Sequence, residues 1–247
     1  GIWSKIGTFY FDGTNDETVS LITTGGDFAR VADMKFEKNE NYVPDYITVS
    51  NKTTEIDAVQ SITIDSHGGS FAVYAQGISI AYLKISNGGS TVNALRIKSG
   101  ADKTYAGTVT LPGDTFLNLR LSGDYDGGKL IFENVTDKPH ADIVLTDALM
   151  NDAPIYEISA GKIGITAKLY NLSSASCVVI AGLYDGESLI SSAVSDVQTV
   201  ENGGAEASLS MNITKLTPNS VLKVCVWDSF VGMHPLTKPQ LFYPYTG

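Results

Sequence analysis

The sequence has few of the residues that build metal and redox sites: two cysteines and three histidines in 247 residues. Cys177 and Cys225 stand in separate apolar stretches, with no CxxC spacing and no Cys/His cluster, which argues against the usual zinc motifs. We interpret both as small free core residues. A disulfide across a sandwich is the alternative, and spacing alone does not decide between the two.

Positive charge and long apolar runs are also scarce. Lys and Arg number 17 against 27 Asp and Glu, a net charge of −10. Phosphate backbones and anionic membranes would be repelled, so we expect no nucleic acid partner and no membrane insertion. No apolar run approaches the roughly 18 residues of a membrane helix. The sequence shows no signal-peptide pattern and opens with Gly1 rather than Met, as a mature or excised fragment would.

Catalytic motifs are missing as well. The sequence contains no G-x-S-x-G, H-E-x-x-H or P-loop pattern, and His67, His140 and His234 stand in or beside turns without a partner nearby in the sequence. Small sandwiches rarely provide a deep cleft. We therefore expect no enzymatic activity; a pair of carboxylates brought together only by folding, as in a glycosidase, is the alternative.

What the sequence does contain is a regular succession of short strands and turns. Runs rich in Val, Ile, Thr, Tyr and Phe alternate with period two and are separated by turn signals such as Asn87-Gly88-Gly89 and Asn202-Gly203-Gly204. This pattern predicts an all-β fold of tandem β-sandwiches. Two polar joins divide the chain into a partial β segment (1–41), a middle module (42–152) and a C-terminal module (153–247).

Short motifs in the first two pieces resemble known bacterial modules. Ile6–Phe11 (IGTFYF) and Ala29–Phe36 (ARVADMKF), which follow a tryptophan, resemble the last strands of a golvesin or xanthan-lyase C-terminal type β domain. Ala81–Gly89 (AYLKISNGG), Gly127–Ile131 (GGKLI) and His140–Val144 (HADIV) resemble carbohydrate-binding modules of families 6 and 35. The second resemblance implies a jelly-roll-like sandwich whose closing strand is His140–Val144.

The resemblance to carbohydrate-binding modules implies a set of ligand residues. The implied sugar-binding residues are Asn87, Tyr82, Phe116, Asn134 and His140. Residues 42–152 contain no tryptophan, so Phe116 is the nearest substitute for the family's sugar-stacking ring. Asn87 suits a hairpin turn equally well.

The same resemblance implies a calcium ion between the first and last strands of the middle module. The ligands that the resemblance implies are Glu55, Asp57 and Asp142. Carboxylates are suitable because calcium takes six to eight oxygen atoms, usually from carboxylates and carbonyls. Acidic clusters around Asp12 and at Asp124 and Asp126 are the alternatives, and each cluster could equally be an ordinary solvated turn.

Sugar binding also needs aromatic faces, together with groups that hydrogen-bond to hydroxyls. Six tyrosines stand next to expected loops, and each could instead cap a strand with its hydroxyl in water. They are Tyr42, Tyr46, Tyr105, Tyr125, Tyr243 and Tyr245.

The C-terminal module resembles a β-sandwich found at the C-termini of clostridial and related surface enzymes. The resemblance rests on Tyr184-Asp185-Gly186, Val226–Ser229 (VWDS) and Met233–Leu236 (MHPL). It implies an immunoglobulin-like accessory module without chemistry of its own, in which Trp227 packs beside Pro235.

Together these resemblances imply a secreted or cell-surface location and a non-catalytic, carbohydrate-binding accessory region of a polysaccharide-degrading enzyme. Its partners would be a polysaccharide and the other modules of the larger enzyme. The alternative is a purely structural spacer or docking region of a cell-surface protein. Exposed aromatic residues near Asn87 would favour the first interpretation, and their burial would favour the second.

Overall fold

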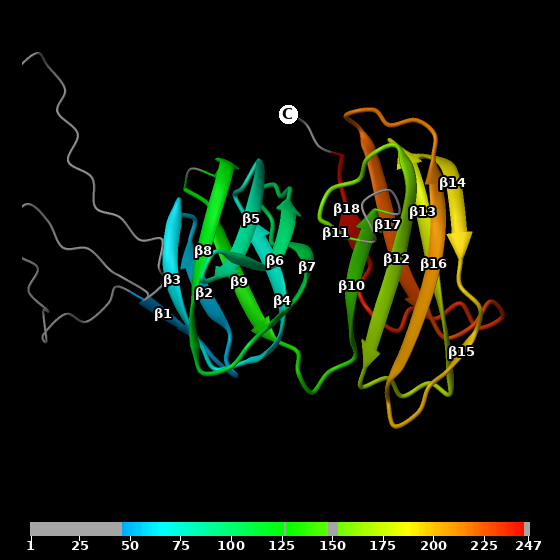
Figure 1. Ribbon diagram of the computed structural model, residues 1–247, viewed down its shortest axis with the longest axis horizontal. Helices are drawn as coiled ribbons and strands as arrows, with labels where there is room; N and C mark the ends of the chain where they lie inside the picture. The colour runs from blue at the N-terminus through cyan, green and yellow to red at the C-terminus, as the bar shows by residue number, and fades with distance from the viewer. Residues whose placement is uncertain (1–45, 126, 148–152, 245–247) are drawn as a thin grey trace, which may run out of the picture. The chain divides into compact units, whose positions relative to one another are not determined.

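The computed structural model describes residues 46–125, 127–147 and 153–244, and these residues are all-β (Figure 1). Within these ranges no helix is long and apolar enough to cross a membrane. The expected segment 1–41, with its golvesin-like motifs and the acidic cluster around Asp12, lies outside the described residues, as does Asp126.

Nine strands form the first sandwich. They are β1 (Tyr46–Val49), β2 (Thr54–Asp57), β3 (Ser61–Ser66), β4 (Gly69–Gln76), β5 (Ile80–Asn87), β6 (Ser90–Ile97), β7 (Thr104–Leu111), β8 (Thr115–Asp124) and β9 (Lys129–Asn134). One sheet has the order β1-β3-β8-β5-β6 and the other the order β2-β9-β4-β7. Successive strands from β2 to β5, and again from β7 to β9, alternate between the two sheets, which gives the predicted jelly-roll-like arrangement.

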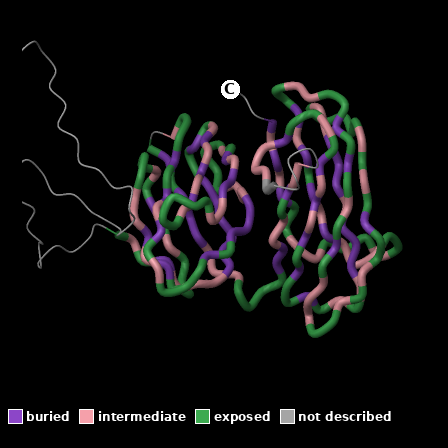
Figure 2. Tube along the Cα trace, viewed as in Figure 1, coloured by how far each residue is buried: buried purple, intermediate pink, exposed green. Residues whose placement is uncertain are grey.

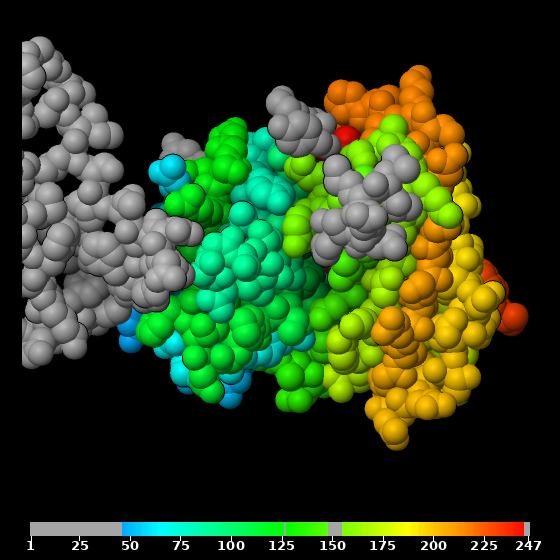
Figure 3. Space-filling view, in the orientation of Figure 1, coloured from blue at the N-terminus to red at the C-terminus, as the bar shows by residue number. Residues whose placement is uncertain are grey.

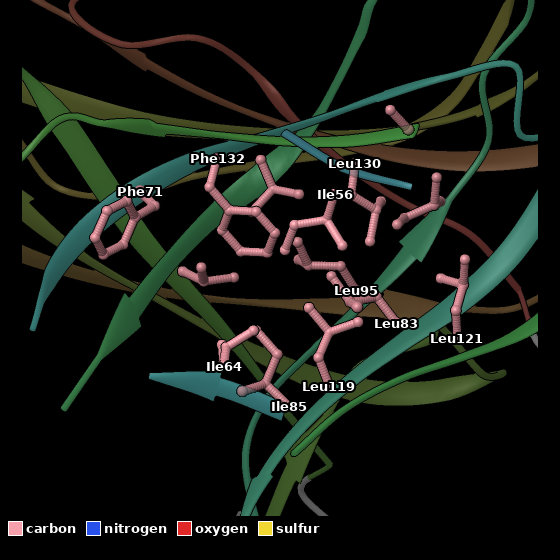
Figure 4. Packing of buried hydrophobic residues seen from close by; sticks show 14 of the residues in the cluster. Ile56, Ile64, Phe71, Leu83, Ile85, Leu95, Leu119, Leu121, Leu130 and Phe132 are labelled. Atoms are coloured by element: carbon pink, nitrogen blue, oxygen red, sulfur yellow. The ribbon is translucent and has the colours of Figure 1, made fainter. Parts of the chain in front are cut away.

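The first core lies between these two sheets, and along several strands buried positions alternate with more exposed ones (Figure 2). On β5, Ala81, Leu83 and Ile85 are buried, while the residues between them are less so. Phe71 and Phe132 are fully buried, with ring centroids 6.4 Å apart, and aliphatic side chains from both sheets surround them (Figure 4). On β5, period-two patterning therefore fixes which face of the strand is buried.

Gly123 allows the end of β8 to pair closely with the start of β5, where it lies opposite Ala81. Its φ of 121° is a conformation that other residues rarely adopt. A Cβ atom there would lie 2.5 Å from the backbone oxygen of Ile80 and 2.9 Å from the Cα of Ala81. Because both neighbours are backbone atoms, the position requires glycine.

Nine further strands form the second sandwich. They are β10 (His140–Asp147), β11 (Ala153–Ile155), β12 (Gly161–Tyr170), β13 (Ser176–Asp185), β14 (Ser188–Val194), β15 (Gln198–Thr199), β16 (Ala205–Ile213), β17 (Ser220–Trp227) and β18 (Gln240–Phe242). The sheets have the orders β11-β10-β12-β16 and β14-β13-β17-β18, with β15 paired to β13. This is the predicted immunoglobulin-like sandwich. Trp227 forms a β-bridge with Pro235, beside which it was expected.

The strand β10 belongs to the second sandwich, whereas the sequence analysis expected it to close the first. It pairs with β12 along its whole length, from His140 opposite Tyr170 to Asp147 opposite Ile163. Its buried residues Ala141 and Leu145 pack into the second core. In Figure 1, β10 accordingly lies next to β12.

The two cysteines are free. They lie on neighbouring strands, β13 and β17, but on opposite faces of that sheet. Cys177 points into the second core with Val179 and Ala181, whereas Cys225 lies on the other face, opposite Ile180. The structure therefore favours free thiols over a disulfide.

The strand β14 is the outer strand of its sheet, and its apolar side chains are exposed. Leu189, Ile190 and Val194 are 44–56% exposed, and β14 contains no charged residue. In the space-filling view the yellow segment that contains β14 lies along an open border of the second sandwich (Figure 3). Such an edge can pair with another strand.

Candidate functional site

A polar row crosses the outward face of the five-stranded sheet in the first sandwich. The pairing places four residues in line across β1, β3, β8 and β5: Tyr46, Thr63, Asn118 and Ser86. Their neighbours along the strands point inward, since Ile64, Leu117 and Ile85 are buried in the core. The row therefore presents hydroxyl and amide groups outward.

Two aromatic residues stand together on this face. The rings of Tyr46 and Phe116 pack edge to face, with centroids 5.3 Å apart and an interplanar angle of 69°. Tyr46 is 37% exposed and Phe116 is 44% exposed. Most phenylalanines are buried, so an exposed pair on a polar sheet is a candidate contact surface. We call this surface the Tyr46–Phe116 face.

Hydrogen-bonding groups surround the aromatic pair. Asp65 lies opposite Phe116 in the β3–β8 pairing, and its Oδ2 is 3.5 Å from His67 Nε2. The amide of Asn118 donates to Ser61 Oγ at 3.2 Å. The face thus combines aromatic rings with carboxylate, amide and hydroxyl groups, the set that recognises a polyhydroxylated ligand.

The turn containing Asn87 lies at the same end of the sheet. Asn87 is exposed and pairs with Ser90 across the glycine hairpin, while the preceding Ser86 lies opposite Asn118 of the polar row. The loop that precedes Phe116 is held there too, because Ser66 Oγ donates to Pro112 O at 2.6 Å. The predicted residues Asn87 and Phe116 therefore share one end of the first sandwich.

Tyr82 lies elsewhere on the outward side of this sheet. Burial raises the pKa of its hydroxyl, and the nearby charge of Glu157 and the neighbouring Tyr156, both from the second sandwich, raise it further. Arg96, opposite Tyr82 on β6, pairs with Glu157 at 3.3 Å. Tyr82 therefore lies by the junction between the sandwiches and not beside Phe116.

Asn134 and His140, both expected to bind sugar, flank the connection between the two sandwiches. The Oδ1 of Asn134 accepts the N–H of Thr136 at 3.1 Å. His140 is 5% exposed, bonds to Lys138 O through Nδ1 at 2.8 Å and stacks on Tyr170 at 4.8 Å. Both side chains therefore have structural partners at this connection.

The three residues expected to bind calcium are not brought together. Glu55 and Asp57 lie on β2, and Glu55 pairs with Lys129 at 3.5 Å. Asp142 lies on β10 and accepts a hydrogen bond from Thr110 on β7 at 2.6 Å, and β7 is at the opposite border of the sheet from β2. Among the described residues, no three His, Cys, Asp or Glu side chains are grouped to hold a metal ion.

A pocket of about 260 Å³ lies where the four-stranded sheet of the first sandwich meets the second sandwich. Tyr74 and Tyr105 pack edge to face, 5.7 Å apart, and Tyr105 shares a 2.8 Å hydrogen bond with Thr108. Burial raises the pKa of Tyr105 to about 12. The pocket is lined by Ala72, Tyr74, Tyr105, Thr108, Glu133, Val135, Lys138, Pro139, His140, Ala141, Thr237 and Lys238.

Tyr105 is one of the tyrosines expected beside a loop, whereas Tyr74 was not expected at a site. The missed signal is the unbroken apolar run Phe71–Ala75, which does not alternate. A strand of this kind is buried on both faces, and here the second face packs with Ile131 in a small separate cluster. Of the other expected tyrosines, Tyr125 packs at the edge of the first core, burial raises the pKa of Tyr243, and Tyr42 and Tyr245 lie outside the described residues.

The remaining histidine is paired with a carboxylate. His234 Nδ1 lies 3.0 Å from Asp228 Oδ2, and the hydrogen bonds from His234 lower the pKa of Asp228. Ser229 Oγ bonds to the same carboxylate and not to the imidazole. The arrangement holds the turn after β17 and does not align a nucleophile with a base.

No protein-family model and no curated protein matches the chain. In structure it is similar to Bifidobacterium dentium β-glucuronidase in complex with coumarin-3-O-glucuronide, at 11% identity and a TM-score of 0.27 over 78% of this chain. It is also similar to a GH2 β-galacturonidase from Eisenbergiella tayi bound to galacturonate, at 15% identity and a TM-score of 0.24 over 72% of this chain. The chain spans 38% and 33% of those two proteins. The similarity is coarse.

Proposed function

We propose that the chain is a non-catalytic accessory region that binds a polysaccharide through the Tyr46–Phe116 face. The observation that carries this proposal is the exposed aromatic pair on a sheet face of hydroxyl, amide and carboxylate groups. An open sheet face would accept an extended sugar chain without enclosing it, which suits retention on a polymer better than catalysis. The region would serve a larger, secreted or surface-bound polysaccharide-active enzyme.

The test is affinity electrophoresis of the full chain in gels that contain soluble plant and microbial polysaccharides, guided by a glycan array. Phe116→Ala should weaken binding about tenfold, equivalent to ~1.4 kcal/mol. Phe230→Ala is the matched control, because Phe230 is 53% exposed in the second sandwich and should leave binding unchanged. Absence of binding to every glycan would refute the function, and equal binding by Phe116→Ala would refute the site.

Calcium binding stays a prediction, and a chelator arm in the same experiment tests it. The predicted ligands Glu55, Asp57 and Asp142 do not form one site, so a calcium requirement would need other oxygen ligands. Loss of glycan binding on chelation, restored by added calcium, would support the prediction.

A structural spacer is the second candidate, and the connection between the sandwiches favours it. Val135 N–H donates to Ser70 O at 2.8 Å from one side, and Asn171 Nδ2 donates to Thr136 O at 2.6 Å from the other. A connection bonded to both sandwiches limits their relative motion, as a spacer requires. A spacer without ligand would show no glycan binding and a single unfolding transition in calorimetry.

A further inference from the structure

We propose that the pocket at the junction of the sandwiches binds a small carboxylate. This inference does not rest on the Tyr46–Phe116 face, which lies on the other sheet of the first sandwich. The pocket is bordered by β4, β7 and β9 of the first sandwich, by the start of β10, and by the connection from β17 to β18, which contributes Thr237 and Lys238.

The charges around the pocket favour an anionic ligand. The lining includes two ammonium groups, Lys138 and Lys238, and one carboxylate, Glu133. Lys103 forms an ion pair with Glu133, and the hydrogen bond from Lys103 is the largest cause of the lowered pKa of that carboxyl. Lys138 and Lys238 also act on Glu133, and the carboxylate of Asp142 acts on Tyr105, so three ammonium groups face two carboxylates, a local excess of one positive charge in a chain whose net charge is −10. A local reversal of sign of this kind selects an anion.

The ammonium group of Lys238 is held at the pocket by its aromatic neighbours. It contacts the hydroxyl of Tyr74 and lies 4.6 Å from the centroid of the Tyr74 ring and 5.7 Å from that of Tyr105. The two rings therefore hold this cation by cation–π attraction at the pocket. Among the described residues no carboxylate lies within ion-pair distance of Lys238, and its charge acts on Glu133 only from across the pocket, so the ammonium group can donate to a ligand.

The pocket suits an anion better than a neutral sugar. A neutral sugar would need an open aromatic face, but Lys103 lies 4.2 Å from the centroid of the Tyr74 ring and Lys238 lies 4.6 Å from it. Lys103 therefore occupies one face of the Tyr74 ring, Lys238 lies at its hydroxyl end, and the ring is only 7% exposed, which leaves no open face for a pyranose. What the pocket offers instead is ammonium donors together with the hydroxyl groups of Thr108 and Thr237. These groups suit the charge-assisted hydrogen bonds of a carboxylate.

The volume of the pocket limits the size of its ligand. A volume of about 260 Å³ falls just below the ~300–1,000 Å³ of sites for drug-sized ligands. The ligand is therefore a single small molecule, such as one acidic monosaccharide or a dicarboxylic acid, and not a polymer segment. Ala72, Tyr74 and His140 give the pocket a buried wall, while Lys138 and Lys238 are exposed at its rim.

The test is calorimetric titration of the full chain with glucuronate, succinate and glucose at constant ionic strength. We expect binding of glucuronate, succinate or both, and none of glucose. Binding of glucuronate alone would assign an acidic sugar, and binding of succinate alone a simple dicarboxylate. Failure of both acids to bind, or equal binding of glucose, would overturn the proposal.

Three lysine variants locate the site. Lys238→Met and Lys138→Met should each weaken binding of the acid about tenfold, because each loses one charge-assisted contact. Lys138→Met is the safer variant for folding, since the contact between Lys238 and Tyr74 is retained. Lys215→Met is the matched control, because Lys215 is exposed and does not line the pocket. Equal affinity in all three variants would overturn the assignment to this pocket.

Discussion

Thr110 on β7 donates a hydrogen bond of 2.6 Å to Asp142 on β10, and this bond joins the two sandwiches. Thr110 also shares a 2.8 Å bond with Ser70, so a chain of three polar groups runs from β4 to β10. Asp142, one of the three carboxylates expected to bind calcium, thus forms a structural hydrogen bond to the neighbouring sandwich.

Thr110→Val should lower the free energy of unfolding by about 1 kcal/mol, because Asp142 and Ser70 both lose a hydroxyl partner. Urea denaturation measures the difference. The matched control is Thr91→Val at an exposed position on β6, which should change stability by less than about 0.5 kcal/mol. Equal stability of the two variants would mean that the bond contributes nothing.

Gly123→Ala should destabilise the first sandwich by about 3 kcal/mol or more, because its Cβ would meet backbone atoms of Ile80 and Ala81 at a positive φ. Gly89→Ala is the control. Gly89 also has a positive φ, 83°, but nothing lies within 4 Å of its Cβ, so its cost should be only about 1 kcal/mol. Thermal melts that rank the variants in the reverse order would contradict this account of the close approach of β8 to β5.

Stability should fall as pH rises from about 10 to 12, in part through Tyr105. Its pKa in the folded chain, about 12, exceeds the ordinary tyrosine value of 10.0, so the unfolded chain releases this proton first. The stabilising contribution is therefore complete below pH 10 and is lost as pH rises towards 12. Tyr105→Phe should reduce the alkaline loss by about 1–2 kcal/mol, measured by urea melts at pH 9 and pH 11. An identical pH slope in both proteins would show that Tyr105 titrates normally.

The two thiols should differ in reactivity. Burial raises the pKa of both, so both should react with iodoacetamide more slowly than a free cysteine at neutral pH. Cys177 is fully buried and should be modified only on unfolding, whereas the partly exposed Cys225 should react in the folded chain. Mass spectrometry with and without urea gives the comparison. Rapid modification of Cys177 without urea would contradict its place in the core.

The sequence predicts the fold well because strand alternation is a local signal. It does not assign β10, because the alternating run His140–Val144 would suit either core. The choice of sandwich depends on pairing with β12, which lies later in the chain and was not visible in the local pattern.

The candidate site shows the same limit. Tyr46 and Phe116 can each be picked out singly as a candidate contact, yet they are 70 positions apart in the sequence. Their proximity depends on the parallel pairing of β1 with β3 and on the register of β3 against β8. The set Glu55, Asp57 and Asp142 fails for the same reason, since it assumed that β10 closes the first sandwich.

The connection at Val135 and Thr136 is hydrogen-bonded to both sandwiches. It would therefore set where a ligand bound to the first sandwich lies relative to the second. A flexible tether lets a bound polymer sample a large volume, which lowers its effective concentration near any neighbouring site. A connection fixed from both sides narrows that volume, so the polymer would be delivered along a restricted path. Thr136→Pro, combined with Asn171→Ala, would replace this fixed connection with a flexible tether.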